Sequence, residues 1–311
     1  MPIKQISVIL PVFNEESIIE QLAVEIEQHI ESPIEFVFIN DGSTDKTLEI
    51  LKKYRTGKKS NQKKIIDLAR NFGHQPALMA GLSSVSSDSD IIVVMDADFQ
   101  DSPEDIPLLI SRVEEGYDCV YAVRTANSGN RLIDSFTKFF YKIQKIFLRF
   151  TIPPNAGTFS VFNRDVLNNI LDFKESEIYF PGLRAYVGLN QTGVPVKRRA
   201  RAHGESKVGK MGLINLSMSG ILGFSVVPMR AIFLFGVFMT TLCFFLGIVL
   251  FLMKITGITK VMGVTTILIF MLGLFGIQIM FVGIVGEYVG KLFIEAKRRP
   301  RWIIRKIIDD K

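Results

Sequence analysis

Strand patterns and helix patterns alternate along residues 5–124, and this alternation constrains the fold more than any other feature of the chain. Short apolar runs rich in β-branched residues indicate strands at 5–12, 34–40, 65–69, 91–96 and 119–124. Amphipathic stretches between them indicate helices at 17–29, 41–54 and 75–84. A repeated strand–helix order predicts a mostly parallel sheet with helices on both faces. We interpret the basic stretch 58–64 as a solvated loop.

Carboxylates follow the most apolar of these strands. The run Ile91–Met95 leads directly into Asp96 and Asp98, and an amide follows at Gln100. Open α/β sheets bind ligands at the carboxyl ends of their strands. Two carboxylates and an amide there supply the hard oxygen ligands that Mg²⁺ and Mn²⁺ prefer. The alternative is that the two aspartates only end the strand and begin a turn.

Polar residues also follow the first two strands, within 11–16 and 40–43. In a parallel sheet these ends meet the carboxylates at one edge, where amides and acids can bind a base and a ribose. Arg124 ends the fifth strand at the same edge, and its planar guanidinium suits a phosphate. No GxGxxG motif follows the first strand and no GxxxxGK[ST] motif occurs, which disfavours a dinucleotide oxidoreductase and a P-loop NTPase.

These motifs together resemble the GT-A, family-2 glycosyltransferases, and within them the transferases that place a sugar on a polyprenyl phosphate. The most specific matches are Asn71-Phe72-Gly73-His74-Gln75 and Gly204-Glu205-Ser206-Lys207. The likeness extends over nearly the full length through 11–16, 40–43, 96–98, 180–188 and 224–228. The resemblance implies a Rossmann-like GT-A domain.

The resemblance also implies roles for single residues. The nucleotide would contact Pro11, Phe13, Glu15, Asp41 and Asp96. The metal, Mg²⁺ or Mn²⁺, would be held with the diphosphate by Asp96, Asp98 and Gln100. Arg124 would bind the acceptor phosphate. Further candidates for the acceptor phosphate or the diphosphate are Arg131, Lys138, Arg201, His203, Ser206 and Lys207.

The chain departs from the family pattern after Gly157, where similar transferases commonly carry an acidic residue and this chain has Thr158. A phosphate monoester has a second pKa of about 6, so the acceptor is already largely dianionic and nucleophilic at neutral pH. A protein base is therefore not required, and Thr158 affects the expected rate more than the expected fold.

Two long stretches without charge, 231–253 and 261–286, indicate two transmembrane helices. Residues 197–311 hold 17 basic and 5 acidic side chains, and most of the basic ones flank these stretches. The positive-inside rule then places both termini and the catalytic domain in the cytoplasm. An apolar face at 207–229 indicates an interfacial helix before the first span.

The sequence thus predicts a GT-A domain at 1–206, an interfacial helix at 207–229, a membrane region at 230–287 and a basic cytoplasmic tail at 288–311. We expect an integral protein of the bacterial inner membrane. It would transfer a hexose, with glucose preferred, from a UDP-sugar to undecaprenyl phosphate with inversion. Alternatives are another donor, such as GDP-mannose or UDP-aminoarabinose, another acceptor, or a non-catalytic nucleotide-sugar-binding protein. The resemblance implies a homo-oligomer, and the acidic body disfavours nucleic-acid binding.

Overall fold

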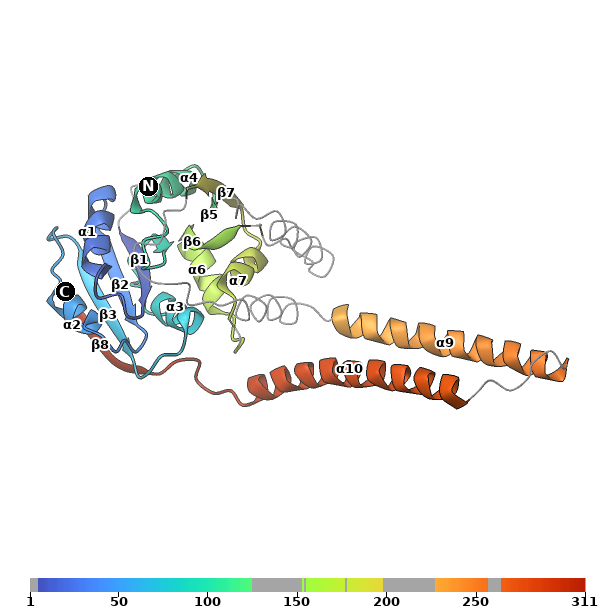
Figure 1. The fold of residues 1–311 in the computed structure, drawn as a ribbon. Coiled ribbons are helices and arrows are strands. Elements are labelled where there is room, and N and C mark those ends of the chain that lie inside the picture. The colour runs from blue at the N-terminus through green and yellow to red at the C-terminus, as the bar shows by residue number, and fades with distance from the viewer. Residues whose placement is uncertain are drawn as a thin grey trace. The chain divides into compact units, whose positions relative to one another are not determined.

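The protein was analysed as a computed structural model, which describes residues 5–124, 153, 155–176, 178–197, 227–256 and 264–310. An eight-stranded sheet with the order β7-β5-β6-β4-β1-β2-β3-β8 forms the centre of the first compact unit (Figure 1). Its strands are β1 (Ile6–Val12), β2 (Ile34–Asn40), β3 (Gln62–Leu68), β4 (Ile91–Val94), β5 (Cys119–Arg124), β6 (Ala156–Asn163), β7 (Gln191–Val196) and β8 (Ile304–Asp310).

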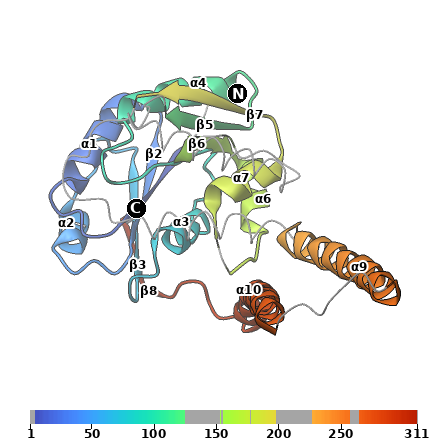
Figure 2. The same cartoon turned by 45° about the vertical axis from the view of Figure 1, so that its right-hand side comes forward.

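Helices cover both faces of this sheet (Figure 2). On one face the apolar core includes residues of α1 (Ile19–His29), α2 (Thr47–Lys53) and α4 (Ile106–Glu114), which follows the short helix η1 (Pro103–Asp105). On the other face it includes residues of α3 (His74–Leu82), α6 (Arg164–Leu171) and α7 (Phe180–Val187). The central strands are buried on both sides, as their continuous apolar runs predict.

The predicted mostly parallel sheet is confirmed. Parallel pairs join β1 to β2 and β4, β2 to β3, and β5 to β7. Strand β6 is antiparallel to both of its neighbours, β4 and β5, and β8 is antiparallel to β3. The carboxyl ends of β1, β2, β4 and β5 therefore lie along one edge together with the amino end of β6. We call this the functional edge.

The predicted solvated loop at 58–64 is wrong for its last residues, because β3 already begins at Gln62. Lys63 is buried and donates to the carbonyl oxygens of Leu51 and Tyr54. Its side chain also pairs with Asp310 of β8 at 2.8 Å. A buried ammonium is tolerated here because its donors are satisfied.

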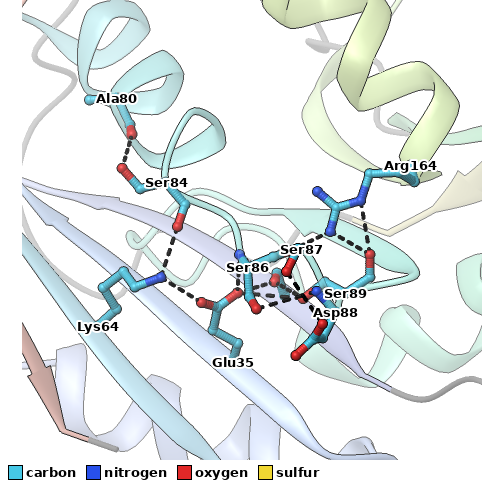
Figure 3. Close-up of polar contacts among 10 residues, drawn as sticks. Glu35, Lys64, Ala80, Ser84, Ser86, Ser87, Asp88, Ser89 and Arg164 are labelled. Carbon is cyan, nitrogen blue, oxygen red and sulfur yellow. Dashed lines mark hydrogen bonds and ion pairs between the residues drawn. The ribbon is translucent and has the colours of Figure 1, made fainter.

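A polar cluster lies at the opposite edge of the sheet, where the parallel strands begin (Figure 3). The buried Glu35 carboxylate, at the start of β2, pairs with Lys64 Nζ at 2.8 Å and accepts from Ser86 N at 3.0 Å. Ser7 also donates to it. Arg164 donates to the carbonyl oxygens of Ser86 and Ser89. The cluster thus fixes the turn that leads into β4.

Two long helices, α9 (Val227–Ile255) and α10 (Val264–Ala296), form the second compact unit. Phe235 of α9 packs edge-on against Phe281 of α10, with ring centroids 5.5 Å apart. Among the described residues, one stretch, Leu274–Ala296, is long and apolar enough to cross a membrane. The apolar stretch Ile232–Leu246 in α9 is shorter. The prediction of two spanning helices is met in part, and the apolar stretch of α10 continues past the predicted end at 286.

The chain returns to the sheet after α10, which the sequence patterns did not predict. Residues assigned to a basic tail at 288–311 continue α10 to Ala296 and then form β8, which belongs to the same compact unit as the other strands. The interfacial helix predicted at 207–229 lies outside the described residues except for its last three, which begin α9.

Candidate functional site

Asp96 and Asp98 lie just past the end of β4 at the functional edge, as the sequence predicts. The backbone turns sharply there, because Phe99 has a φ of +60°, a value that a bulky side chain rarely adopts. The turn lets Asp98 Oδ1 accept from the backbone N of Gln100 at 3.1 Å. Backbone strain of this kind gathers at functional sites. The turn therefore fixes the position of the Asp98 carboxylate.

His74 contacts Asp96 of this acid pair, a role that the sequence analysis did not assign to it. Its Nε2 lies 2.8 Å from Asp96 Oδ1. Burial alone lowers the pKa of His74, but the hydrogen bond and charge of Asp96, with the charges of Asp98 and Asp41, raise it overall. The available signal was its place at the start of α3, directly after another strand of the same edge.

Asp41 follows β2 and is buried, with 3% of its surface exposed. Its carboxylate accepts from the backbone N of Phe72 at 2.7 Å and of Gly73 at 3.0 Å. Burial raises the pKa of Asp41, and these two hydrogen bonds act against that rise. Asp41 therefore fixes the loop that carries His74.

The loop after β1 contains Phe13 and Glu15, both partly exposed, and is joined to the loop after β2. The backbone N of Asn14 donates to Ser43 Oγ at 3.1 Å, and that of Glu15 donates to Thr47 Oγ1 at 3.0 Å. Pro11 is buried within β1. The structure thus brings the predicted nucleotide contacts Phe13, Glu15 and Asp41 to neighbouring strand ends.

Arg124 ends β5 at the same edge. Its guanidinium lies over Gly157 of β6, where a Cβ atom would meet Arg124 Nη2 at 2.8 Å. Nη2 is 3.9 Å from a carboxylate oxygen of the buried Asp101. Glycine at 157 is thus what allows the arginine to lie flat against β6. Arg124 thus places a positive charge at the same edge of the sheet as the acid pair, with β6 between them.

Arg184 of α7 is wholly buried, and sequence reasoning assigned it no role. Its Nη1 donates to the Gly157 carbonyl at 3.1 Å, and its guanidinium stacks on Tyr121 with 4.7 Å to the ring centroid. Its Nε and Nη2 have no hydrogen-bond partner among the described residues. Burial lowers the pKa of Arg184. Thr158, buried next to Gly157, offers no charge to balance this cation.

The residues at the end of β4 fit a hard divalent cation. Magnesium usually binds one or two carboxylates and completes its shell with water and substrate phosphates. Asp96, Asp98 and the Gln100 amide supply that kind of partial oxygen shell. No group of three or more His, Cys, Asp or Glu side chains able to hold a metal occurs among the described residues. The described residues would therefore supply only part of the shell of such a metal, and water and substrate phosphate oxygens would complete it.

The remaining predicted site residues, Arg131, Lys138, Arg201, His203, Ser206 and Lys207, lie outside the described residues.

Comparison with known proteins identifies the family. The family model described as glycosyl transferase family 2 matches residues 7–171, which include Asp96, Asp98 and Arg124. The chain belongs to glycosyl transferase family 2. A family member from Escherichia coli named prophage bactoprenol glucosyl transferase homolog is 35% identical, over 97% of this chain and 99% of its own. An uncharacterized glycosyltransferase of Bacillus subtilis, YkcC, is 36% identical, over 97% and 94%.

The fold is shared with solved structures. Glucosyl-3-phosphoglycerate synthase from Mycobacterium tuberculosis, crystallised with Mn²⁺, UDP-glucose and phosphoglyceric acid, has a TM-score of 0.51 and 20% identity. The match covers 70% of this chain and 78% of that one. The likeness supports the GT-A, Rossmann-like fold predicted for the sheet domain of this family 2 protein.

Proposed function

We propose that this family 2 glycosyltransferase moves a hexose, with glucose preferred, from a UDP-sugar to a polyprenyl phosphate at the cytoplasmic face of the membrane. The observation that carries the proposal is the division of the functional edge into an acidic and a basic half. Asp96 and Asp98 lie at the end of β4, and Arg124 lies at the end of β5 with β6 between them. Relatives named bactoprenol glucosyl transferase support the acceptor class.

The acidic half suits the donor. Asp96, Asp98 and Gln100 would hold Mg²⁺ or Mn²⁺, which when bound offsets the negative charge of a diphosphate. Pro11, Phe13, Glu15 and Asp41 come from the neighbouring strand ends and would frame the nucleoside. The short joined loops after β1 and β2 hold this frame in place before the donor binds, which reduces the entropic cost of orienting the donor.

The basic half suits the acceptor. The Arg124 guanidinium can bind a phosphate monoester with two parallel hydrogen bonds. That phosphate is already largely dianionic at neutral pH, so it can attack the anomeric carbon in line with departure of UDP and invert the configuration. The bond to the UDP oxygen breaks as the new bond to phosphate forms, and no covalent enzyme intermediate is needed. The proposal therefore needs no carboxylate at Thr158.

The course of the chain supports a membrane hairpin. The strands before α9 and the strand after α10 belong to one sheet. A chain that leaves that sheet through α9 and re-enters it through α10 must cross a membrane an even number of times. We infer that α9 and α10 cross together, with both termini in the cytoplasm. Exposed apolar side chains along both helices, such as Phe244 and Val282, support lipid contact.

Transfer of label from UDP-glucose to undecaprenyl phosphate, with Mg²⁺ and purified full-length protein, tests the function. We expect label in the lipid fraction and near-complete loss of transfer in Asp98→Ala. Asp88→Ala, at an exposed position of the opposite edge, should transfer as the wild type does. Equal transfer by Asp98→Ala would refute the acid-pair assignment.

Thr158 favours one alternative, a nucleotide-sugar-binding protein without turnover. In that case the folded protein would bind UDP but move no label to any lipid or glycan. A donor screen that includes GDP-mannose and UDP-aminoarabinose separates this outcome from a different sugar preference.

A further inference from the structure

After α10 the chain re-enters the sheet unit at Pro300 and forms β8, the last strand of the sheet (Figure 1). In the antiparallel pairing of β8 with β3, Ile304 lies opposite Leu68 and Asp310 lies opposite Lys63. The amino end of β8 therefore lies at the carboxyl end of β3, beside the loops of the candidate donor site. Its far end lies at the opposite edge of the sheet.

Arg305 and Ile303 bind the end of β3 at this point. Arg305 Nη2 donates to the carbonyl oxygen of Ala69 at 2.7 Å, and Nη1 lies 3.4 Å from Asp67 Oδ2. The backbone N of Ala69 donates to the carbonyl oxygen of Ile303 at 2.9 Å. Ala69 is thus held by both of its backbone polar groups. It begins the loop that Asp41 fixes and that carries His74.

Asp67 extends this contact to the loop after β2. Its Oδ1 accepts from Asn40 Nδ2 at 2.7 Å, and Asn40 Oδ1 accepts from the backbone N of Ser43 at 3.2 Å. Ser43 Oγ in turn accepts from the backbone N of Asn14, in the loop after β1. A continuous series of hydrogen bonds therefore runs from Arg305 to both loops that frame the candidate nucleotide site.

The burial of Asp67 makes this series of hydrogen bonds depend on Arg305. The Asp67 side chain is only 6% exposed, and Arg305 is its one ion-pair partner among the described residues. A buried carboxylate that loses its cation tends to shift or to draw in water. Asp67 also decides which way the Asn40 amide points, because it accepts only from Nδ2. A displaced Asp67 would therefore turn Asn40 away from Ser43.

We propose that β8 is a positioning element of the donor site and that Arg305 is its key residue. Arg305 does not contact the donor. It acts through Asp67 and Ala69, which set the loops after β2 and β3. Strand β8 thus supports the site from the end of the strand order that lies away from β5 and Arg124. That these loops bind a sugar donor rests on the proposed function, whereas their positioning by β8 does not.

Full-length Arg305→Met, compared with Arg55→Met, tests the proposal. Arg55 pairs with Asp310 Oδ2 at 2.8 Å, at the other end of the same strand, and its side chain is 77% exposed. Lys63 also holds Asp310, so β8 stays paired in that control. Three quantities are measured: amide hydrogen exchange of residues 69–74, the fluorescence of Trp302, and the affinity for UDP in the presence of Mn²⁺. Trp302 is the single tryptophan of the chain.

In Arg305→Met we expect faster exchange at Phe72 and Gly73. We also expect a dissociation constant for UDP only about two- to fivefold higher, because the Arg305 side chain is 58% exposed and its ion pair is screened by water. Trp302 emission should stay unshifted if β8 remains on the sheet. In Arg55→Met exchange and affinity should match the wild type. Unchanged exchange in Arg305→Met, or an equal change in both variants, would overturn the proposal. Failure of the wild type to bind UDP would refute the proposed function while the exchange result still decides the role of β8.

Discussion

Replacing Glu35 by Gln tests the reasoning about the buried cluster at the edge opposite the site. The Glu35 carboxylate is 2% exposed, and its two oxygens are used by different partners. Oε1 pairs with Lys64 Nζ, whereas Oε2 accepts from Ser86 N and from Ser7 Oγ. Glutamine keeps the shape but loses the charge and turns one acceptor into a donor. The substitution therefore leaves Lys64 without its anion.

The expected cost follows from burial. Removing one partner of a fully buried ion pair costs about 3–5 kcal/mol. Lys64 is 17% exposed and retains a hydrogen bond to the Ser84 carbonyl at 2.9 Å, which lowers the cost. We expect a loss of about 2–4 kcal/mol in the free energy of unfolding. At about 2–4 °C per kcal/mol for a domain of this size, the midpoint should fall by roughly 5–15 °C.

The assay is thermal unfolding of the full-length protein in detergent, followed by the fluorescence of Trp302, which packs against the core of the sheet domain. Glu31→Gln, the same change at an exposed position, is the control. The double variant Glu35→Gln/Lys64→Met should recover part of the loss, because it removes the unpaired ammonium. Equal midpoints for Glu35→Gln and Glu31→Gln would refute the reasoning. UDP affinity below the transition should not change, since the cluster lies away from the functional edge.

The remaining predictions concern two glycines with positive φ, a buried arginine and a buried thiol. Gly42→Ala should destabilise the protein and weaken UDP binding, because Gly42 has a φ of +68° and a Cβ would lie 2.5 Å from the backbone carbon of Arg70. Gly116→Ala, with a φ of +105° and open space around it, measures by thermal unfolding the cost of the φ angle alone, about 1–2 kcal/mol. Arg184→Met should leave the unfolding midpoint unchanged or raise it, since a buried cation with unsatisfied donors costs stability; a fall of several degrees would contradict this. Burial raises the pKa of the Cys119 thiol to about 12 from 9.0. Between these two pH values the folded state keeps the thiol proton, whereas the unfolded state loses it. The free energy of unfolding should therefore fall as the pH rises through this range, and it should fall less in Cys119→Ala. Peptide-level alkylation should label Cys119 only after unfolding.

Much of the site could be predicted from the sequence because it depends on strand ends. Asp41, Asp96 and Arg124 each follow an apolar run, and parallel strands bring their carboxyl ends to one edge whatever the details of packing. The role of His74 was missed because its contact with Asp96 depends on how Asp41 fixes a loop. Arg184 was missed because nothing in a short helix pattern shows that an arginine is buried.

The sequence by itself determined the parallel core, the acid turn after β4 and the long apolar helices, because each is encoded by a local period or an uninterrupted run. Only the tertiary structure decided that β6 enters the sheet antiparallel between β4 and β5, and that the chain returns as β8. Strand pairing between distant segments depends on which edge is open and which side chains it buries. The local pattern near Lys63 therefore resembled a solvated loop, and the pattern near Arg305 resembled a basic tail. The fold nevertheless uses both residues to join the last strand to the sheet.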